Sequence, residues 1–217
     1  MKSKSKFFVF GTIVFFCIIS ICVFFFSKTG VTSVKIDTTG QPMIGNNNAP
    51  VEMIIFSDYK CPSCKLFHET FFNKIDEKYI KNGQVKVYHI NFPFIGKDST
   101  TAAIVGEAIY SQNKNAFWQY YDAVYKNQGK ETDNWATPDF LMKIVKENVK
   151  NIDYEKLKED IKSEKFKKIV EADKKLGEKI GIKHTPSIFI NGKYMERINL
   201  DDIFKEIDKD LKNEKNN

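Results

Sequence analysis

Cysteine is scarce in this chain: only four of its 217 residues are cysteines. Two of them, Cys17 and Cys22, lie in an uncharged apolar stretch that we expect to be in lipid, far along the chain from Cys61 and Cys64. A closed structural zinc site needs four ligands, which this distribution does not supply. We therefore predict no metal ion and no cofactor. A mixed site that includes His68 stays open as an alternative, but a helix-surface histidine is more often simply solvated.

Surplus positive charge is also small. The formal charge is +6, and the lysines at positions 2, 4, 6 and 28 supply four of these charges. Beyond residue 98, lysines and acidic residues are interspersed, which is typical of solvated helix surfaces rather than of a basic groove. The sequence therefore argues against a nucleic-acid partner. It also contains no internal repeat or low-complexity tract, and its length fits one domain with an insertion.

The longest apolar run is Phe7 to Phe26, twenty residues without a charge. As a helix rising ~1.5 Å per residue it would span ~30 Å, the thickness of a bilayer core. The lysines before this run favour a cytoplasmic N-terminus, so we expect everything after Lys28 to lie outside the cell membrane. Phe26-Ser27-Lys28-Thr29-Gly30 has no small-residue cleavage pattern, and bulky residues precede both cysteines of the run. We therefore favour a retained single-pass anchor over a cleaved signal peptide or a lipoprotein.

The motif Cys61-Pro62-Ser63-Cys64 stands between a strand-like run, residues 51–57, and an amphipathic segment, residues 62–80. Two residues three positions apart in a first helical turn share a face, close enough for a disulfide. Free backbone N–H groups and the positive helix end favour a thiolate at Cys61, so we expect Cys61 to be the nucleophile and Cys64 the resolving thiol. The spacing by itself is also typical of half a zinc site or of a structural disulfide.

The order of the periodic segments predicts an α/β fold. Strand-like residues 51–57 and 85–90 flank the helix over residues 62–80, which is typical of a right-handed βαβ unit with parallel strands. The predicted inner stripe of that helix consists of Leu66, Phe67, Phe71, Ile75 and Tyr79. A further short strand is expected at residues 34–36.

Residues 98–180 show helical periodicity, with expected caps at Asp98 and Ser99, at Thr137-Pro138 and at Asp153. The aromatic residues between positions 117 and 125 are expected to form a core rather than a platform for stacked bases. Beyond this region, Asn191-Gly192 predicts a hairpin between strands at 187–190 and 193–197. A final helix is expected over residues 200–211.

Four segments together resemble the DsbA family of thiol-disulfide oxidoreductases: Ala49-Pro50-Val51, Ser57-Asp58-Tyr59-Lys60-Cys61-Pro62-Ser63-Cys64, Phe117-Trp118 and Thr185-Pro186-Ser187-Ile188-Phe189-Ile190-Asn191-Gly192. Within that family the likeness is greatest to the BdbD proteins of bacilli, which share the Cys-Pro-Ser-Cys motif. The resemblance implies a thioredoxin-like α/β fold with an inserted helical domain, here preceded by a single transmembrane helix. The resemblance covers about residues 45–211 and suggests a thioredoxin-like domain at 46–97 and 181–217 with a helical insertion at 98–180. The apolar run and the composition place a membrane anchor at 1–28 and a tether at 29–45 before it.

The resemblance also implies a role, partners and further site residues. Members of the family form disulfides outside the cytoplasm, so the expected substrates are reduced secreted proteins. The expected partner for reoxidation is a membrane quinone reductase of the DsbB or BdbC type. Thr185 and Pro186 match the family's cis-proline loop, which faces the active-site sulfurs. The cis form of a peptide bond has a low free-energy cost only before proline. The exposed backbone beside a cis-proline can pair with an extended substrate.

Two positions depart from the family's pattern. DsbA itself has Pro-His between its cysteines, whereas Ser63 supplies only a hydroxyl, so the strength of this oxidant stays open. Many relatives have a buried glutamate six residues before the first cysteine, where this chain has Ile55. A proton relay through that acid is therefore not available. His184, next to Thr185, either faces the sulfurs or lies on a surface loop.

The sequence thus predicts an anchored, extracytoplasmic oxidoreductase that introduces disulfides into secreted or surface proteins. Cys61 and Cys64 form its redox pair, and Thr185 and Pro186 complete the site. Two alternatives stay open. One is a disulfide reductase or isomerase on the same fold, and the other is a non-catalytic anchored binding module whose disulfide is only structural.

Overall fold

The computed structural model describes residues 34–215. Among these residues no helix is both long enough and apolar enough to cross a bilayer. The predicted anchor at residues 1–28 lies outside the described part of the chain. Its presence and its retention without cleavage therefore stay predictions.

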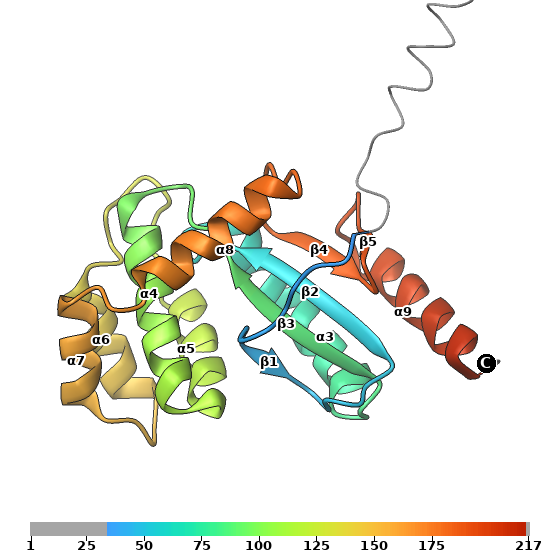
Figure 1. Cartoon of the computed structure of the whole chain (residues 1–217), viewed down its shortest axis with the longest axis horizontal. Helices are drawn as coiled ribbons and strands as arrows, with labels where there is room; N and C mark the ends of the chain where they lie inside the picture. Colours follow the sequence, from blue (N-terminus) through green and yellow to red (C-terminus); the bar gives the residue numbers. More distant parts are fainter. Residues whose placement is uncertain (1–33, 216–217) are drawn as a thin grey trace, which may run out of the picture. The chain divides into compact units, whose positions relative to one another are not determined.

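A five-stranded sheet forms the centre of the described residues (Figure 1). Its strands are β1 (Met43–Ile44), β2 (Val51–Ser57), β3 (Val85–Asn91), β4 (Ser187–Ile190) and β5 (Lys193–Tyr194). They lie in the order β1-β3-β2-β4-β5, and β2 runs parallel to β3 and antiparallel to β4. The near-continuous apolar sequence of β2 suits this central place, because both faces of the strand are covered. The predicted parallel strand pair is confirmed.

Two other strand predictions were wrong. Residues 34–36 do not form a strand, and the first strand is β1, whose Met43 lies opposite Tyr88 of β3. The last hairpin turns at Asn191-Gly192, as predicted, and both residues have the positive φ that a tight hairpin turn requires. However, β5 ends at Tyr194 instead of residue 197, because the chain then turns to bury Met195 in the core.

The helix after the cysteine motif extends over residues 62–80, as predicted, but it is not α-helical throughout. Its α-helical parts, α2 (Pro62–Phe67) and α3 (Asn73–Ile75), alternate with two π-helical segments, η1 (His68–Phe72) and η2 (Asp76–Ile80). A π turn holds more residues than an α turn, so the buried face shifts along the sequence.

Part of the predicted inner stripe was wrong. Leu66 is 58 % exposed, and Phe72 is buried in the place expected of Phe71. His68 is buried as well, in contrast to the solvated position we expected, and its Nε2 lies 3.0 Å from Asp122 Oδ1. Strict 3.6-residue periodicity cannot predict the burial of Phe72, because this residue lies in a π-helical segment.

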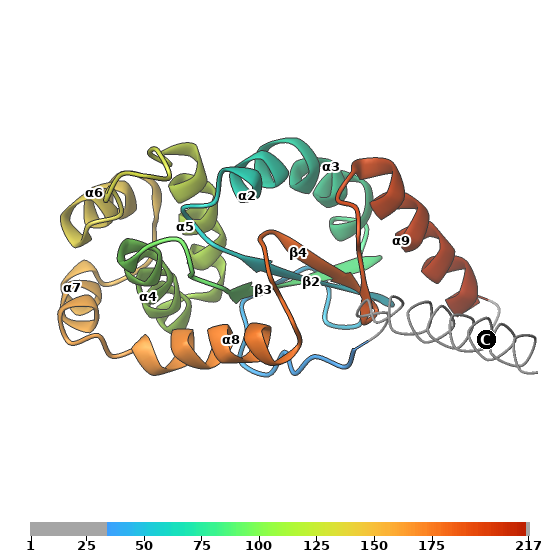
Figure 2. The same ribbon diagram turned by 90° about the horizontal axis from the view of Figure 1, so that it is seen from above.

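Helices cover both faces of the sheet. Figure 2 shows α2, α3 and α9 (Leu200–Lys215) on one face and α8 (Lys167–Lys179) on the other. Buried apolar residues fill the first interface, among them Val51, Ile75, Val87, Ile203 and Ile207. On the other face Gly177 allows α8 to approach closely, because a Cβ atom there would lie 2.5 Å from the Phe92 ring.

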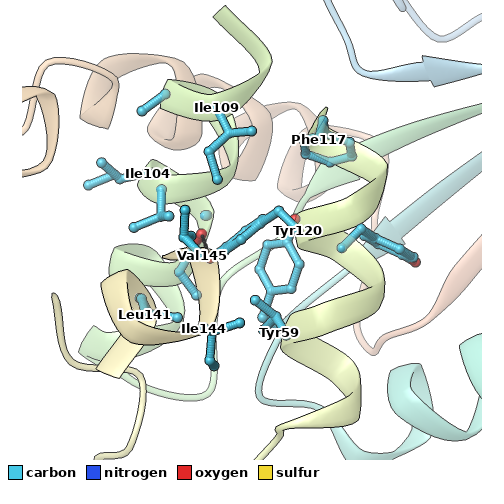
Figure 3. Packing of buried hydrophobic residues seen from close by; sticks show 14 of the residues in the cluster. Tyr59, Ile104, Ile109, Phe117, Tyr120, Leu141, Ile144 and Val145 are labelled. Atoms are coloured by element: carbon cyan, nitrogen blue, oxygen red, sulfur yellow. Dashed lines mark hydrogen bonds between the residues drawn. The ribbon is translucent and has the colours of Figure 1, made fainter. Parts of the chain in front are cut away.

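The helical insertion has a core of its own. It begins with α4 (Lys97–Gln112), α5 (Lys114–Lys126), α6 (Pro138–Asn148) and α7 (Tyr154–Lys162), before α8 leads back to the sheet. Figure 3 shows Tyr120 of α5 among apolar side chains of α4 and α6, including Ile104, Ile109, Leu141, Ile144 and Val145. The aromatic residues of α5 therefore form a core, as predicted. Tyr59, from the loop after β2, enters the same core and joins it to the cysteine motif.

The helix caps agree with the sequence in two of three cases. Thr137 and Asp153 accept backbone hydrogen bonds at the starts of α6 and α7. For α4, however, the cap is Gly96, whose N–H donates to the Ser99 hydroxyl at 3.3 Å. Asp98 is not a cap, because its carboxylate takes part in a buried ion pair.

That ion pair joins the residue before Cys61 to the insertion. Lys60 Nζ lies 2.8 Å from Asp98 Oδ1, and the two side chains are only 5 % and 6 % exposed. Lys60 also donates to the Asp133 carbonyl at 2.9 Å, and Asp98 Oδ2 accepts from the Ala136 amide at 3.2 Å. Three segments of the chain are therefore fixed around one buried charge pair.

Removing the negative partner of this pair should destabilise the protein strongly. We expect Asp98→Asn to lower the free energy of unfolding by about 3 kcal/mol or more, because the Lys60 ammonium would stay buried without a counter-charge. The double variant Lys60→Met with Asp98→Asn should lose less than the single variant, since it buries no charge. Denaturant unfolding of both variants measures the difference.

The exposed pair Lys167–Glu164, with its 2.7 Å separation, provides a control. Replacing Glu164 with Gln should change stability by less than about 1 kcal/mol, because solvent screens the pair. An equally small effect of Asp98→Asn would contradict the importance of the buried pair.

Candidate functional site

The two cysteines of the motif lie at the junction of β2 and α2. Cys61 is the N-cap of α2, with extended backbone angles, and Pro62 occupies the first helical position as predicted. Cys64 lies one turn further in. Both thiols are free, and Cys61 is 6 % exposed while Cys64 is 1 % exposed. The nucleophile expected from the sequence is thus the outer of the two sulfurs.

The pKa values of the two thiols are shifted in opposite directions. The pKa of Cys61 is lowered from 9.0 to about 6, chiefly because Cys64 donates a hydrogen bond to its sulfur. The Thr185 side chain and the backbone N–H groups of Cys64 and Ser63 contribute further donors, whereas burial acts in the opposite direction. Burial is the main cause that raises the pKa of Cys64 well above 9.0. At neutral pH the outer sulfur is a thiolate and the inner one a thiol.

Thr185 contacts the Cys61 sulfur through its backbone carbonyl, and Pro186 follows it in the chain. The peptide bond between them is cis, as predicted, and β4 begins immediately afterwards. The Cys61 thiol, when protonated, donates to the Thr185 carbonyl at 3.3 Å. The buried Thr185 hydroxyl has no hydrogen-bond partner among the described residues. It is therefore available to donate to a thiolate, and it lowers the pKa of both cysteines.

His184 does not contact this site. It is exposed, and its Nε2 is hydrogen-bonded to the Tyr194 hydroxyl at 3.0 Å. Of the two positions that the sequence left open for this residue, the structure shows the surface position.

The chain is similar to known thiol-disulfide proteins over most of its length. A family model described as thioredoxin matches residues 37–209. Probable disulfide bond formation protein D of Bacillus cereus is 42 % identical over 172 residues, which are 79 % of each chain. This chain belongs to the DsbA-like family of protein-disulfide oxidoreductases. It is therefore an enzyme and not an anchored binding module.

Two more relatives agree with this membership. Disulfide bond formation protein D of Bacillus subtilis is 37 % identical over 185 residues, 85 % of this chain and 81 % of the relative. The crystal structure of oxidised BdbD from Bacillus subtilis has a TM-score of 0.80 at 36 % identity, covering 85 % of this chain and all of that one. Chlamydia trachomatis DsbA, at 22 % identity and a TM-score of 0.72, shares the fold.

Beneath the cysteines the oxidoreductase has a buried polar cluster that the sequence did not predict. A 2.7 Å hydrogen bond joins Ser57, at the end of β2, to His89 of β3, and the Tyr125 hydroxyl donates to Ser57 at 3.2 Å. Burial lowers the pKa of His89 to about 3, so its ring is neutral. Tyr125 and Cys64 belong to the same buried cluster, so this polar group lies close to the inner cysteine. In the sequence, this cluster is signalled by one polar residue in each of two apolar strands, Ser57 in β2 and His89 in β3.

A second buried polar cluster joins β3, α4 and α8. Within residues 34–215, no three His, Cys, Asp or Glu side chains are grouped as metal ligands. Asn91 donates to Glu107 at 2.8 Å and to Asp173 at 3.1 Å, and Gln41 also donates to Asp173. Burial and the charge of Asp173 raise the pKa of Glu107 to about 8. Carboxylate and amide oxygens of this kind suit a hard cation and not zinc.

Removing the Thr185 hydroxyl should make Cys61 less acidic. We expect Thr185→Val to raise the pKa of Cys61 from about 6 towards 9, because the valine keeps the shape of threonine but cannot donate to the thiolate. Alkylation of the Cys61 peptide as a function of pH, followed by mass spectrometry, gives the pKa apart from the other cysteines.

The sign of this effect can be checked at one pH. As pH falls through about 6, Cys61 takes up a proton and its alkylation slows. At pH 7 the wild type should therefore react faster than the valine variant. Thr137→Val, which removes a hydroxyl at the start of α6, should leave the reaction unchanged, and equal pKa values in the Thr185 variant and the wild type would refute the role of the hydroxyl.

Proposed function

We propose that this oxidoreductase introduces disulfides into secreted or surface proteins, and that Cys61 and Cys64 are its redox pair. The observation that carries this proposal is the contrast in acidity between the two thiols. A pKa of about 6 at Cys61 stabilises the reduced form of the enzyme at neutral pH. A stable reduced form makes the disulfide a strong oxidant.

The proposed reaction begins with the oxidised enzyme. A client thiolate attacks the Cys61 sulfur, the Cys61–Cys64 bond breaks, and Cys64 leaves with the electron pair and takes up a proton. A second client thiolate then attacks the client sulfur of the mixed disulfide. Cys61 leaves as a stabilised thiolate. The client has lost two electrons to form its disulfide, and the enzyme has gained them as a dithiol.

The shift at Cys61 favours an oxidase over a reductase. Each unit by which the pKa of a leaving thiol falls corresponds to ~1.4 kcal/mol, or ~30 mV for a two-electron couple. The shift from 9.0 to about 6 therefore makes a substantial contribution to the potential. The Thr185 carbonyl lies 3.3 Å from the Cys61 sulfur, so a client segment that reaches this sulfur also meets the loop of Thr185 and Pro186.

The oxidised enzyme should transfer its disulfide to a reduced client. We expect the full-length protein in detergent to convert a reduced dithiol peptide into its disulfide, with one disulfide transferred per enzyme molecule. Cys61→Ser should abolish the transfer. Cys64→Ser should instead trap mixed disulfides at Cys61 once it is activated with a peptide disulfide. Free thiols and masses report both results.

Equilibration with glutathione separates an oxidase from its alternatives. A reduction potential well above that of thioredoxin, ~−270 mV, supports the oxidase. A potential at or below that value, with rapid reduction of insulin, would instead identify a reductase. Repair of scrambled disulfides without net oxidation would identify an isomerase.

The proposed location is the outer face of the cell membrane, with residues 7–26 as the anchor. Support comes from the uncharged run and the lysines that precede it. Reoxidation is assigned to a membrane quinone reductase of the DsbB or BdbC type, because the reduced enzyme needs an electron acceptor at the same membrane.

Protease treatment of intact protoplasts tests this location. We expect protease added outside to degrade residues 34–215 while a cytoplasmic marker stays intact. Full protection until the cells are lysed would contradict the proposed orientation. Release of the protein into the medium would show that the N-terminal segment is cleaved.

A further inference from the structure

A side chain of the insertion holds the backbone that presents the reactive cysteine. Gln128 follows α5, and its side-chain amide donates to the Tyr59 carbonyl at 2.8 Å and to the Cys61 carbonyl at 3.1 Å. The two accepting carbonyls belong to the loop between β2 and α2. One amide group thus connects two residues of the short segment that ends in the nucleophile.

The chain around Gln128 keeps its amide in place. The Gln128 backbone N–H donates to the Tyr125 carbonyl at 3.2 Å, which fixes the residue to the end of α5. Its neighbour Gly129 has no room for a side chain, because a Cβ atom would lie 2.7 Å from the Trp135 ring. Trp135 in turn packs edge-on against Phe140, with ring centroids 5.9 Å apart. The backbone that carries Gln128 is therefore held by contacts that do not involve the cysteines.

The position of the Cys61 backbone matters most when the disulfide is open. As the N-cap of α2, Cys61 presents its sulfur to the first turn of the helix, where the N–H groups of Ser63 and Cys64 lower its pKa, and this placement depends on the capping conformation. In the oxidised enzyme the covalent bond to Cys64 holds Cys61 at the helix end. In the reduced enzyme only non-covalent contacts do so. Loss of the Gln128 contacts should therefore affect the reduced form more than the oxidised form.

Charged groups near the loop are already engaged elsewhere. Lys60 is paired with Asp98. The Asp58 carboxylate accepts from the Lys60 amide at 2.8 Å and from the amides of Phe94 and Ile95 at 2.9 and 3.1 Å. Gln128 is the neutral donor that reaches the Cys61 carbonyl from the insertion.

We propose that Gln128 is a positioning residue, which holds Cys61 in its helix-capping conformation and thereby favours the reduced state of the redox pair. This inference rests on the proposed function. It means that a residue of the helical insertion helps to set how strongly the enzyme oxidises its clients. No contact between Gln128 and a client is required.

The test is Gln128→Met in the full-length protein, because methionine keeps the length of glutamine and has no N–H to donate. Loss of one hydrogen-bonding group should raise the pKa of Cys61 by about half a unit to one unit. It should also move the equilibrium with glutathione towards the enzyme disulfide by about three- to tenfold. Alkylation of the Cys61 peptide as a function of pH gives the pKa. Acid-quenched mixtures of the enzyme with reduced and oxidised glutathione give the equilibrium constant. Gln128→Glu, which presents only acceptors to the two carbonyls, should shift both in the same direction and further.

A second readout separates positioning from a merely structural role. Thermal unfolding of the oxidised and reduced forms should show a larger loss for the reduced variant. Equal losses in both forms, with an unchanged pKa of Cys61 and an unchanged glutathione equilibrium, would overturn the inference.

Asn127→Ala is the matched control. Its side chain, in the same turn, donates to the Ala123 carbonyl at 2.9 Å instead of to the cysteine loop. We expect it to change neither the pKa nor the equilibrium. If the wild type itself fails to oxidise a dithiol peptide, the proposed function fails whatever Gln128 does. If the wild type is active and Gln128→Met matches it in all three readouts, only the positioning role is refuted.

Discussion

The chemistry of this enzyme depends on one sulfur atom at the amino end of a helix. Burial by itself would make Cys61 a weaker acid, as it does Cys64. The opposite result at Cys61 arises because several donors converge on it: the partner thiol, the Thr185 hydroxyl and two backbone N–H groups. The rest of the structure serves to keep these donors directed at that position.

The two parts of the domain make different contributions to this arrangement. The sheet and its helices supply the groups that touch the sulfurs, from the start of α2 and from the loop before β4. The insertion supplies groups that hold the backbone behind them, through the ion pair of Lys60 with Asp98 and through Gln128. Reactive residues and their supports are thus far apart in sequence but adjacent in the fold.

Much of the fold and the core of the site could be predicted from the sequence. The apolar run of β2, the proline after Cys61 and the Asn191-Gly192 turn are local signals, and each led to the correct element. Thr185 and Pro186 could be placed only through family resemblance, since a Thr-Pro pair has many ordinary uses. Local signals were enough for elements whose conformation is determined by residues next to one another in the sequence.

The remaining features depend on contacts that a linear pattern does not contain. His68 is buried against the rings of Tyr121 and Tyr125 of α5, whereas Leu66 is exposed. Asp98 had the sequence features of a cap, but it became the partner of a lysine 38 positions away. Ser57, His89 and Gln128 are polar residues without a motif. Their importance appears only when the strands and α5 are brought together.

The deep burial of Cys64 has a kinetic consequence. Once a client has displaced it, the inner sulfur recovers a proton and becomes a weak nucleophile, because its pKa lies well above neutrality. Neither Ile55 nor the uncharged His89 can readily take that proton away. Cys64 is therefore slow to attack the mixed disulfide and release the client unchanged. The delay gives the client's own second thiol time to complete the exchange, so the direction of electron flow is protected by a slow back-reaction as well as by equilibrium.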